Sequence, residues 1–162
     1  MTEPERVPKV VAAACAAGQM EVLVELWQTR RTDVAQYLGG QGEAGSGAWQ
    51  PLLLSSLNGH CELVEWLLDV TGVDVGTAVD PNSGMTPLIA ASSNGHTTVV
   101  KVLVASGANT DHAANDAVSG GVGGHQGSTP LTRAAIGGHL ETARELVQAG
   151  ASVDFQVHRS HG

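Results

Sequence analysis

The chain has 162 residues, 42% of them hydrophobic and only 3% aromatic, so it can form one ordinary domain but holds no large aromatic core or base-stacking platform. Sixteen acidic and eight basic residues give a formal net charge of −8, which argues against nucleic acid or an anionic membrane as the partner, because phosphate binding needs clustered lysine and arginine. With two cysteines (Cys15 and Cys61), no apolar run of signal-peptide type and no stretch of membrane-spanning length, we expect a protein of a reducing compartment, cytoplasmic or nuclear.

The first predicted element is an apolar helix within residues 9–19, and the same pattern returns three times along the chain. The later copies lie at 50–60, 86–96 and 129–139 and align without gaps. In every copy this first helix ends at a glycine; these are Gly18, Gly59, Gly95 and Gly138, at intervals of 41, 36 and 43 residues. Self-similarity at a period of about 20–50 residues is the signature of a repeat architecture.

The ends of this first helix have a recognisable chemistry. In the third and fourth copies Thr86 and Thr129 can cap the helix through their hydroxyls, and the proline that follows suits the first helical position, which needs no N–H donor. The terminal glycine fits a backbone that must turn left-handed. Small residues recur along the helix where a neighbour must approach closely, among them Ala14, Ser55, Ala91 and Ala134.

A second helix is predicted after each glycine, because apolar positions recur at i, i+1, i+4 and i+5 and form one stripe. The stripes are Val22, Leu23, Leu26 and Trp27; Leu63, Val64, Leu67 and Leu68; Val99, Val100, Leu103 and Val104; Thr142, Ala143, Leu146 and Val147. One helix pair cannot bury such a stripe alone. We therefore expect the four pairs to stack on one another.

The string Thr-Pro-Leu-x-x-Ala-Ala-x-x-Gly-His, followed by an apolar helix and Gly-Ala, resembles the ankyrin repeat. Residues 86–108 and 129–151 match it best, 50–73 match well and 7–27 match loosely. The resemblance implies an all-α solenoid of stacked helix–turn–helix repeats with projecting β-hairpin-like loops. It would fill 1–162 as a single domain, with repeats at approximately 7–38, 49–80, 85–115 and 128–159. It also implies a protein-binding role through the hairpin tips and the concave helix face.

The sequence departs from that pattern in three places. The intervals exceed the consensus unit of about 33 residues, and the extra residues fall in 39–47 and 115–127, whose glycine-rich composition predicts flexible extensions of the hairpin loops. The first copy lacks the Thr-Pro start and has Gln19 in place of the histidine, as a degenerate N-terminal cap would. Its first helix, however, is apolar almost all round, which is poor chemistry for a cap.

The recurring histidines His60, His96 and His139 are interpreted as structural. Their equal place in each copy favours, by the resemblance, a hydrogen bond between neighbouring loops over a metal site, and no histidine spacing of metal-binding type is present. The glycine-rich loop lacks the Lys-Ser/Thr of a phosphate-binding loop. Ser83 and Ser128 have no matched base to make them nucleophiles. We expect no enzyme activity, no metal and no cofactor.

The candidate partner-binding residues occupy positions that, by the resemblance, face the concave groove. They are Trp49, Met85 and Ser128 at the hairpins, Leu57, Asn58, Ser93, Asn94, Ile136 and Gly137 at the helix ends, and Arg133 on the same side. Exposed apolar clusters often mark interfaces, and tryptophan is enriched at their energetic centres. The alternative is that Trp49 and Met85 fold back and pack on the adjacent loop, whereas Trp27 and Trp66 are interpreted as structural.

The leading hypothesis is a non-catalytic, monomeric protein–protein interaction module, acting as an adaptor, scaffold or inhibitor, with a mild preference for a basic partner. A second hypothesis is a targeting fragment of a larger protein such as an enzyme subunit. The 12 residues from Gly150 to Gly162 parallel the 12 from Gly72 to Gly84, after which a new copy opens, so we expect a fifth repeat in the natural protein. A third hypothesis is self-assembly, with the apolar first helix docking onto another copy.

Overall fold

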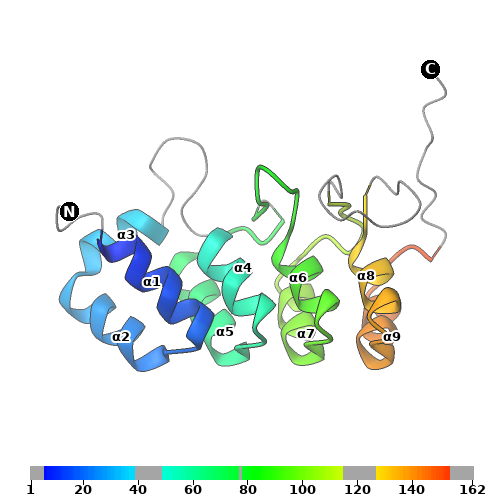
Figure 1. Ribbon diagram of the computed structural model, residues 1–162, viewed down its shortest axis with the longest axis horizontal. Coiled ribbons are helices and arrows are strands. Elements are labelled where there is room, and N and C mark those ends of the chain that lie inside the picture. The colour runs from blue at the N-terminus through cyan, green and yellow to red at the C-terminus, as the bar shows by residue number, and fades with distance from the viewer. Residues whose placement is uncertain (1–5, 39–48, 77, 115–126, 154–162) are drawn as a thin grey trace, which may run out of the picture.

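The computed structural model describes residues 6–38, 49–76, 78–114 and 127–153, and their regular secondary structure is α-helical. The helices are α1 (Arg6–Ala17), α2 (Met20–Thr29), α3 (Arg31–Leu38), α4 (Trp49–Leu57), α5 (Cys61–Thr71), α6 (Pro87–Ser93), α7 (Thr97–Ala105), α8 (Pro130–Ile136) and α9 (Leu140–Gln148). Four pairs, α1/α2, α4/α5, α6/α7 and α8/α9, lie side by side in one row (Figure 1). The expected all-α solenoid is confirmed.

The first helices of the pairs form one layer and the second helices another. Helix α1 packs against α4, α4 against α6 and α6 against α8, while α5, α7 and α9 follow one another in the second layer. We call the first layer, α1, α4, α6 and α8, the inner helices, and the second the outer helices. Because each pair contacts its neighbours in the row, stability comes from repeated local interfaces.

The expected helix ends are present in the structure. The Thr86 side chain accepts a hydrogen bond from the Ile89 N–H at 3.2 Å, and Thr129 accepts one from Thr132 at 3.3 Å. A proline follows each of these caps at the start of the helix. Such a cap contributes about 1 kcal/mol to helix stability.

The core runs between the layers and from pair to pair. The predicted stripes of the outer helices are buried in the second and third pairs, at Leu63, Val64 and Leu67 and at Val99, Val100 and Leu103. The small inner-helix residues Ser55, Ala91 and Ala134 are fully buried, which lets neighbouring inner helices approach closely. Full burial of a leucine or valine side chain stabilises the fold by about 1.5–3 kcal/mol, so the stripes supply the main attraction between pairs.

Helix α3 was not predicted, because its sequence carries no long apolar stripe. It packs against both α1 and α2, buries Val34 completely, and its Tyr37 hydroxyl lies 3.1 Å from the side-chain oxygen of Gln50 in α4. At its first residue the Arg31 guanidinium lies 5.4 Å from the centre of the Trp27 ring. Trp27 in turn meets Trp66 of α5 edge-on, with ring centres 6.1 Å apart. Both tryptophans are therefore structural, as expected.

The described part of the connection from α5 to α6 projects to one side of the row (Figure 1). The connection from α5 to α6 turns tightly, with the Asp80 N–H bonded to the Met85 carbonyl at 2.9 Å and the Gly84 N–H bonded to the Asp80 carbonyl at 2.8 Å. In the described part of the chain, β pairing is limited to the isolated bridge between Ala114 and Ser128. The predicted extensions at 39–47 and 115–127 fall almost wholly outside the described residues, as does the end of the last repeat range, 128–159.

Candidate interaction surface

Hydrogen bonds connect the C-terminal ends of the inner helices to the pairs that follow them. The Nε2 atom of His96 lies 3.1 Å from the Leu57 carbonyl oxygen, and the Asn94 side-chain amide donates to the same oxygen at 2.8 Å. One pair further along, the Nε2 atom of His139 lies 3.0 Å from the Ser93 carbonyl oxygen. The last turns of α4 and α6 are thus each attached to the pair that follows.

These contacts confirm the structural interpretation of the recurring histidines. The first junction is built in the same way, with His60 Nε2 lying 3.1 Å from the Ala16 carbonyl oxygen. The imidazole also fills the space above the glycine of the preceding pair: a Cβ on Gly59 would lie 2.6 Å from His96 Nδ1. Position 59 therefore favours glycine for two reasons: its φ of +77° is left-handed, and a larger side chain would collide with the His96 ring.

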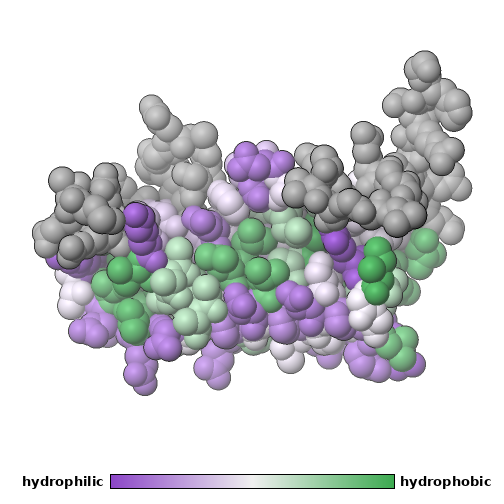
Figure 2. Space-filling view, in the orientation of Figure 1, coloured by the Kyte–Doolittle hydropathy of each residue, from purple (hydrophilic) through white to green (hydrophobic). Residues whose placement is uncertain are grey.

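Six of the ten candidate residues, Gly137 among them, lie at these helix ends and face solvent to different degrees. Ile136 is 79% exposed and Leu57 is 40% exposed. Asn58 and Asn94 are exposed beside them, and Ser93 is half-buried. On the inner-helix side of the molecule, hydrophobic residues gather in a band over α1, α4 and α6 and again near α8 (Figure 2). Two apolar side chains flanked by amides therefore form the most accessible part of the predicted surface.

Three other candidates lie at the opposite, N-terminal ends of the inner helices. Trp49 is the first residue of α4 rather than part of a hairpin; its ring packs against the core, and its indole N–H is buried with no acceptor among the described residues. Met85 is half-buried, and Ser128 is buried at its bridge with Ala114. This placement of Trp49 agrees with the packing alternative. Arg133, the tenth candidate, is half-buried within α8.

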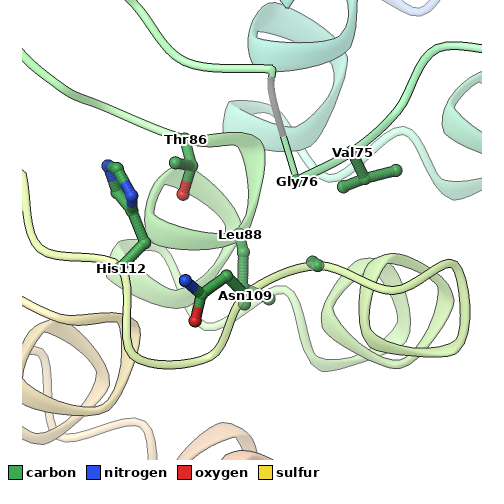
Figure 3. A pocket seen from close by; sticks show the side chains of 7 residues that line it. Val75, Gly76, Thr86, Leu88, Asn109 and His112 are labelled. Carbon is green, nitrogen blue, oxygen red and sulfur yellow. The ribbon is translucent and has the colours of Figure 1, made fainter.

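Two loop residues that sequence reasoning did not single out join the connections to one another. His112 Nε2 lies 3.0 Å from the Gly84 carbonyl oxygen, and the Asp111 carboxylate accepts hydrogen bonds from the Ser152 N–H and hydroxyl, each at 2.8 Å. No periodic pattern marks these residues, because their partners come from neighbouring connections. His112 also lines a shallow depression beside Val75 and Asn109 (Figure 3). Its enclosed volume is about 0 Å³, whereas small-molecule sites typically offer roughly 300–1,000 Å³.

Burial and hydrogen bonding shift the pKa of several side chains. Burial raises the pKa of the Cys15 thiol to about 11, partly offset by a hydrogen bond with Ser55. Hydrogen bonds from Ser83 and Asn82 lower the pKa of Asp80. Among the residues that the structure describes, no cluster of three or more His, Cys, Asp or Glu could hold a metal ion. None of the helices within these ranges has the length and apolar character needed to cross a membrane.

Comparison with protein families gives one match. A family model described as ankyrin repeats, in three copies, matches residues 52–157. The matched range takes in the pairs α4/α5, α6/α7 and α8/α9, which are joined by the histidine contacts described above. The pair α1/α2 and the additional helix α3 precede it.

Proposed function

Because the chain belongs to the ankyrin repeat family, we propose that it is a non-catalytic module that binds another protein along the C-terminal ends of its inner helices. Ankyrin repeats generally mediate protein–protein interaction. The observation that supports this surface is the row of exposed side chains, Leu57, Asn94 and Ile136, set on helix ends that histidine contacts hold in place.

The side chains at these helix ends suit protein binding by their chemistry and by their fixed positions. Leu57 and Ile136 offer apolar area whose burial favours association, and the amides of Asn58 and Asn94 offer donors and acceptors that orient a partner. A surface that is already ordered loses little conformational entropy on binding. The net charge of −8 favours a partner with basic residues around an apolar centre.

The remaining candidates lie away from these helix ends, at the starts of the inner helices or, for Arg133, within α8. Trp49, Met85, Ser128 and Arg133 are buried or half-buried, so they have less area to offer and contribute mainly by supporting the connections. An adaptor, a scaffold or a stoichiometric inhibitor would use such a surface. The described thiols, Cys15 and Cys61, are free, which suits action in a reducing compartment such as the cytoplasm or nucleus.

The experiment is affinity capture with the wild-type chain and with the double variant Leu57→Asp, Ile136→Asp. A partner that binds the wild type and is lost with the double variant supports the proposal. Thr98→Asp is the control, because Thr98 is exposed on the outer helix α7, outside the proposed surface. A partner that is retained by the double variant, or lost equally with the control, contradicts it.

A further inference from the structure

The last helix pair exposes positions that face the following pair elsewhere in the row. Val11, Leu52 and Leu88 are buried, whereas the equivalent Leu131 of α8 is only half-buried. Leu140, the first residue of α9, is 61% exposed, while the equivalent residues of α2, α5 and α7 are half-buried. We call this surface the C-terminal end face; it comprises Leu131, Ala135, Leu140, Ala143 and Val147.

The first pair exposes the complementary positions, which face a preceding pair elsewhere. Val22 of α2 is 37% exposed, whereas its equivalent Leu63 is 2% exposed, and the same position is buried again in α7 and α9. Val10 of α1 is exposed, although Pro51 at the equivalent position is buried. The N-terminal end face comprises Val10, Gln19, Val22, Glu25 and Leu26. Both faces therefore expose apolar side chains at positions that a neighbouring pair covers elsewhere in the row.

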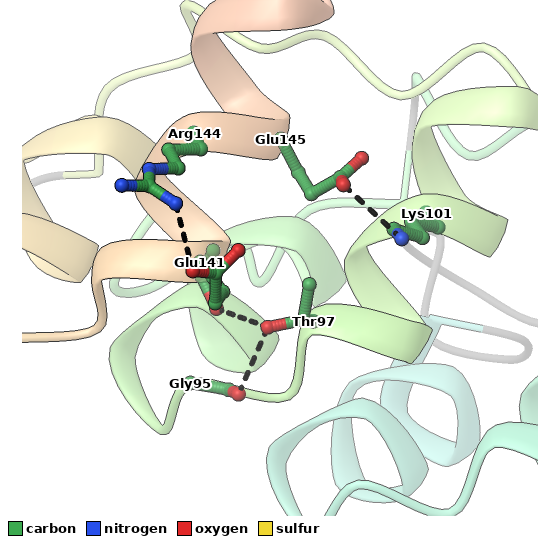
Figure 4. Close-up of polar contacts among 7 residues, drawn as sticks. Gly95, Thr97, Lys101, Glu141, Arg144 and Glu145 are labelled. Atoms are coloured by element: carbon green, nitrogen blue, oxygen red, sulfur yellow. Dashed lines mark hydrogen bonds and ion pairs between the residues drawn. The ribbon is translucent and has the colours of Figure 1, made fainter.

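The junction between the third and fourth pairs shows what such faces do when they meet. The hydroxyl of Thr97 lies 2.8 Å from the hydroxyl of Thr142, and the Lys101 ammonium lies 3.1 Å from the Glu145 carboxylate (Figure 4). In the alignment of the four copies, Thr97 and Lys101 of the third pair correspond to Leu140 and Arg144 of the fourth.

The first pair supplies matching partners at the other side of that junction. By the same alignment, Thr142 and Glu145 correspond to Val22 and Glu25. If the fourth pair of one chain lay against the first pair of another, Leu140 would meet Val22 and Arg144 would meet Glu25. The apolar pair Leu140 and Val22 would take the place of the two threonines. Arg144 and Glu25 would carry the same charges as Lys101 and Glu145 do at the internal junction.

The glycine of the last pair, Gly138, lacks the histidine contact that covers the equivalent glycine in the other three pairs. The space above Gly18, Gly59 and Gly95 is filled by the histidine of the next pair, whereas a Cβ on Gly138 would meet nothing within 4 Å. At the histidine position the first pair carries Gln19, whose side-chain amide can donate a hydrogen bond to a carbonyl. The carbonyl of Ile136 stands at the place of the acceptors in the earlier pairs.

We propose that the chain stacks head to tail on a second copy of itself, with the N-terminal end face of one copy on the C-terminal end face of the other. The contact has the geometry of an internal junction, and because it is heterologous it leaves both outer ends open to further copies. Arg144 currently pairs with Glu141 at 3.0 Å, but both side chains are well exposed, so the guanidinium can also reach Glu25. The net charge of −8 on each copy opposes association, which therefore strengthens as salt screens it.

The test is the mass of the full chain by sedimentation as a function of concentration, with one variant for each face. The wild type is expected to exceed its single-chain mass of 16.6 kDa as concentration rises. Val22→Glu and Leu140→Glu each place a charge in the contact, and each is expected to weaken self-association at least about tenfold. Thr98→Glu is the control and leaves association unchanged, because Thr98 is exposed on α7, outside both faces, at a position where the other three pairs carry glutamate.

Mixing the two variants separates head-to-tail stacking from other modes. Val22→Glu keeps an intact C-terminal end face and Leu140→Glu an intact N-terminal one, so their equimolar mixture forms dimers and no larger species. Arg144→Glu weakens association and Glu25→Arg on the other chain restores it. Circular dichroism checks that each variant is folded.

Three results overturn the proposal. One is a wild-type chain that stays at 16.6 kDa up to about 1 mM, as happens if a further segment covers either face. The second is association that neither variant weakens, and the third is a mixture that forms no dimers. None of these outcomes depends on partner binding along the inner helices, so the two proposals fail separately.

Discussion

The imidazole Nε2 of His96 lies 3.1 Å from the carbonyl oxygen of Leu57, a residue 39 positions earlier in the chain. The same residue whose side chain is proposed to meet a partner therefore carries, on its backbone, the attachment point of the next helix pair. Binding and stacking are coupled at this residue, because a displaced His96 would release the helix end that presents the Leu57 side chain.

Removing this histidine should weaken the junction. We expect His96→Ala to lower the free energy of unfolding by about 1–3 kcal/mol, because the hydrogen bond to the Leu57 carbonyl oxygen and the packing of the ring over Gly59 are lost together. Urea unfolding followed by circular dichroism measures the change. His96→Gln retains a donor and should recover part of the loss; equal losses for the two variants would mean that the hydrogen bond contributes nothing.

The contact above the glycine can be separated from backbone strain by comparing two glycines. Gly59 and Gly138 have similar left-handed backbones, with φ of +77° and +71°, but only Gly59 lies under a histidine ring. We expect Gly138→Ala to cost about 1 kcal/mol from the backbone alone, and Gly59→Ala at least about 2 kcal/mol. Both are measured by denaturant unfolding at low protein concentration. Equal costs would show that the ring above Gly59 yields freely.

Stability should fall at alkaline pH through Cys15. Burial raises the pKa of this thiol from 9.0 to about 11, so the folded chain favours the protonated form. Its contribution is present below about pH 9 and is lost as pH rises toward about 11, by roughly 2 kcal/mol. The measurement is unfolding free energy against pH for the wild type and for Cys15→Ala. A constant difference between the two from pH 8 to 11 would contradict the assignment to this thiol.

Two candidate residues should respond differently to truncation. Leu57→Ala is expected to change unfolding free energy by less than about 0.5 kcal/mol while weakening partner binding by about 1–2 kcal/mol. Trp49→Ala should instead lower stability by about 1–3 kcal/mol, because the ring packs against the core. Thermal unfolding and titration with the captured partner give the two readouts. A Leu57→Ala variant that loses stability and binding in parallel would identify Leu57 as part of the core.

Much of the fold could be predicted from the sequence because its determinants are local and recur. The Thr-Pro caps, the terminal glycines and the spacing of the stripes each describe a single helix, and four copies in register imply that the helices stack. The role of the histidines followed from the ankyrin resemblance and from their equal place in each copy. Helix α3 was missed because its packing rests on Val34 and Tyr37 alone, too few residues to form a visible period.

Exposure, in contrast, was decided only by the tertiary structure. Leu57 and Ser128 had equal standing as candidates, yet one lies at a solvent-facing helix end and the other is buried at a bridge to Ala114. Likewise Val22 and Leu63 occupy the same place in the repeat, but only Leu63 has a preceding pair to cover it. A repeating sequence determines the shape of each unit, whereas the burial of a side chain depends on atoms supplied by neighbours some forty residues away. Among the described residues, the first and last pairs each have such a neighbour on one side.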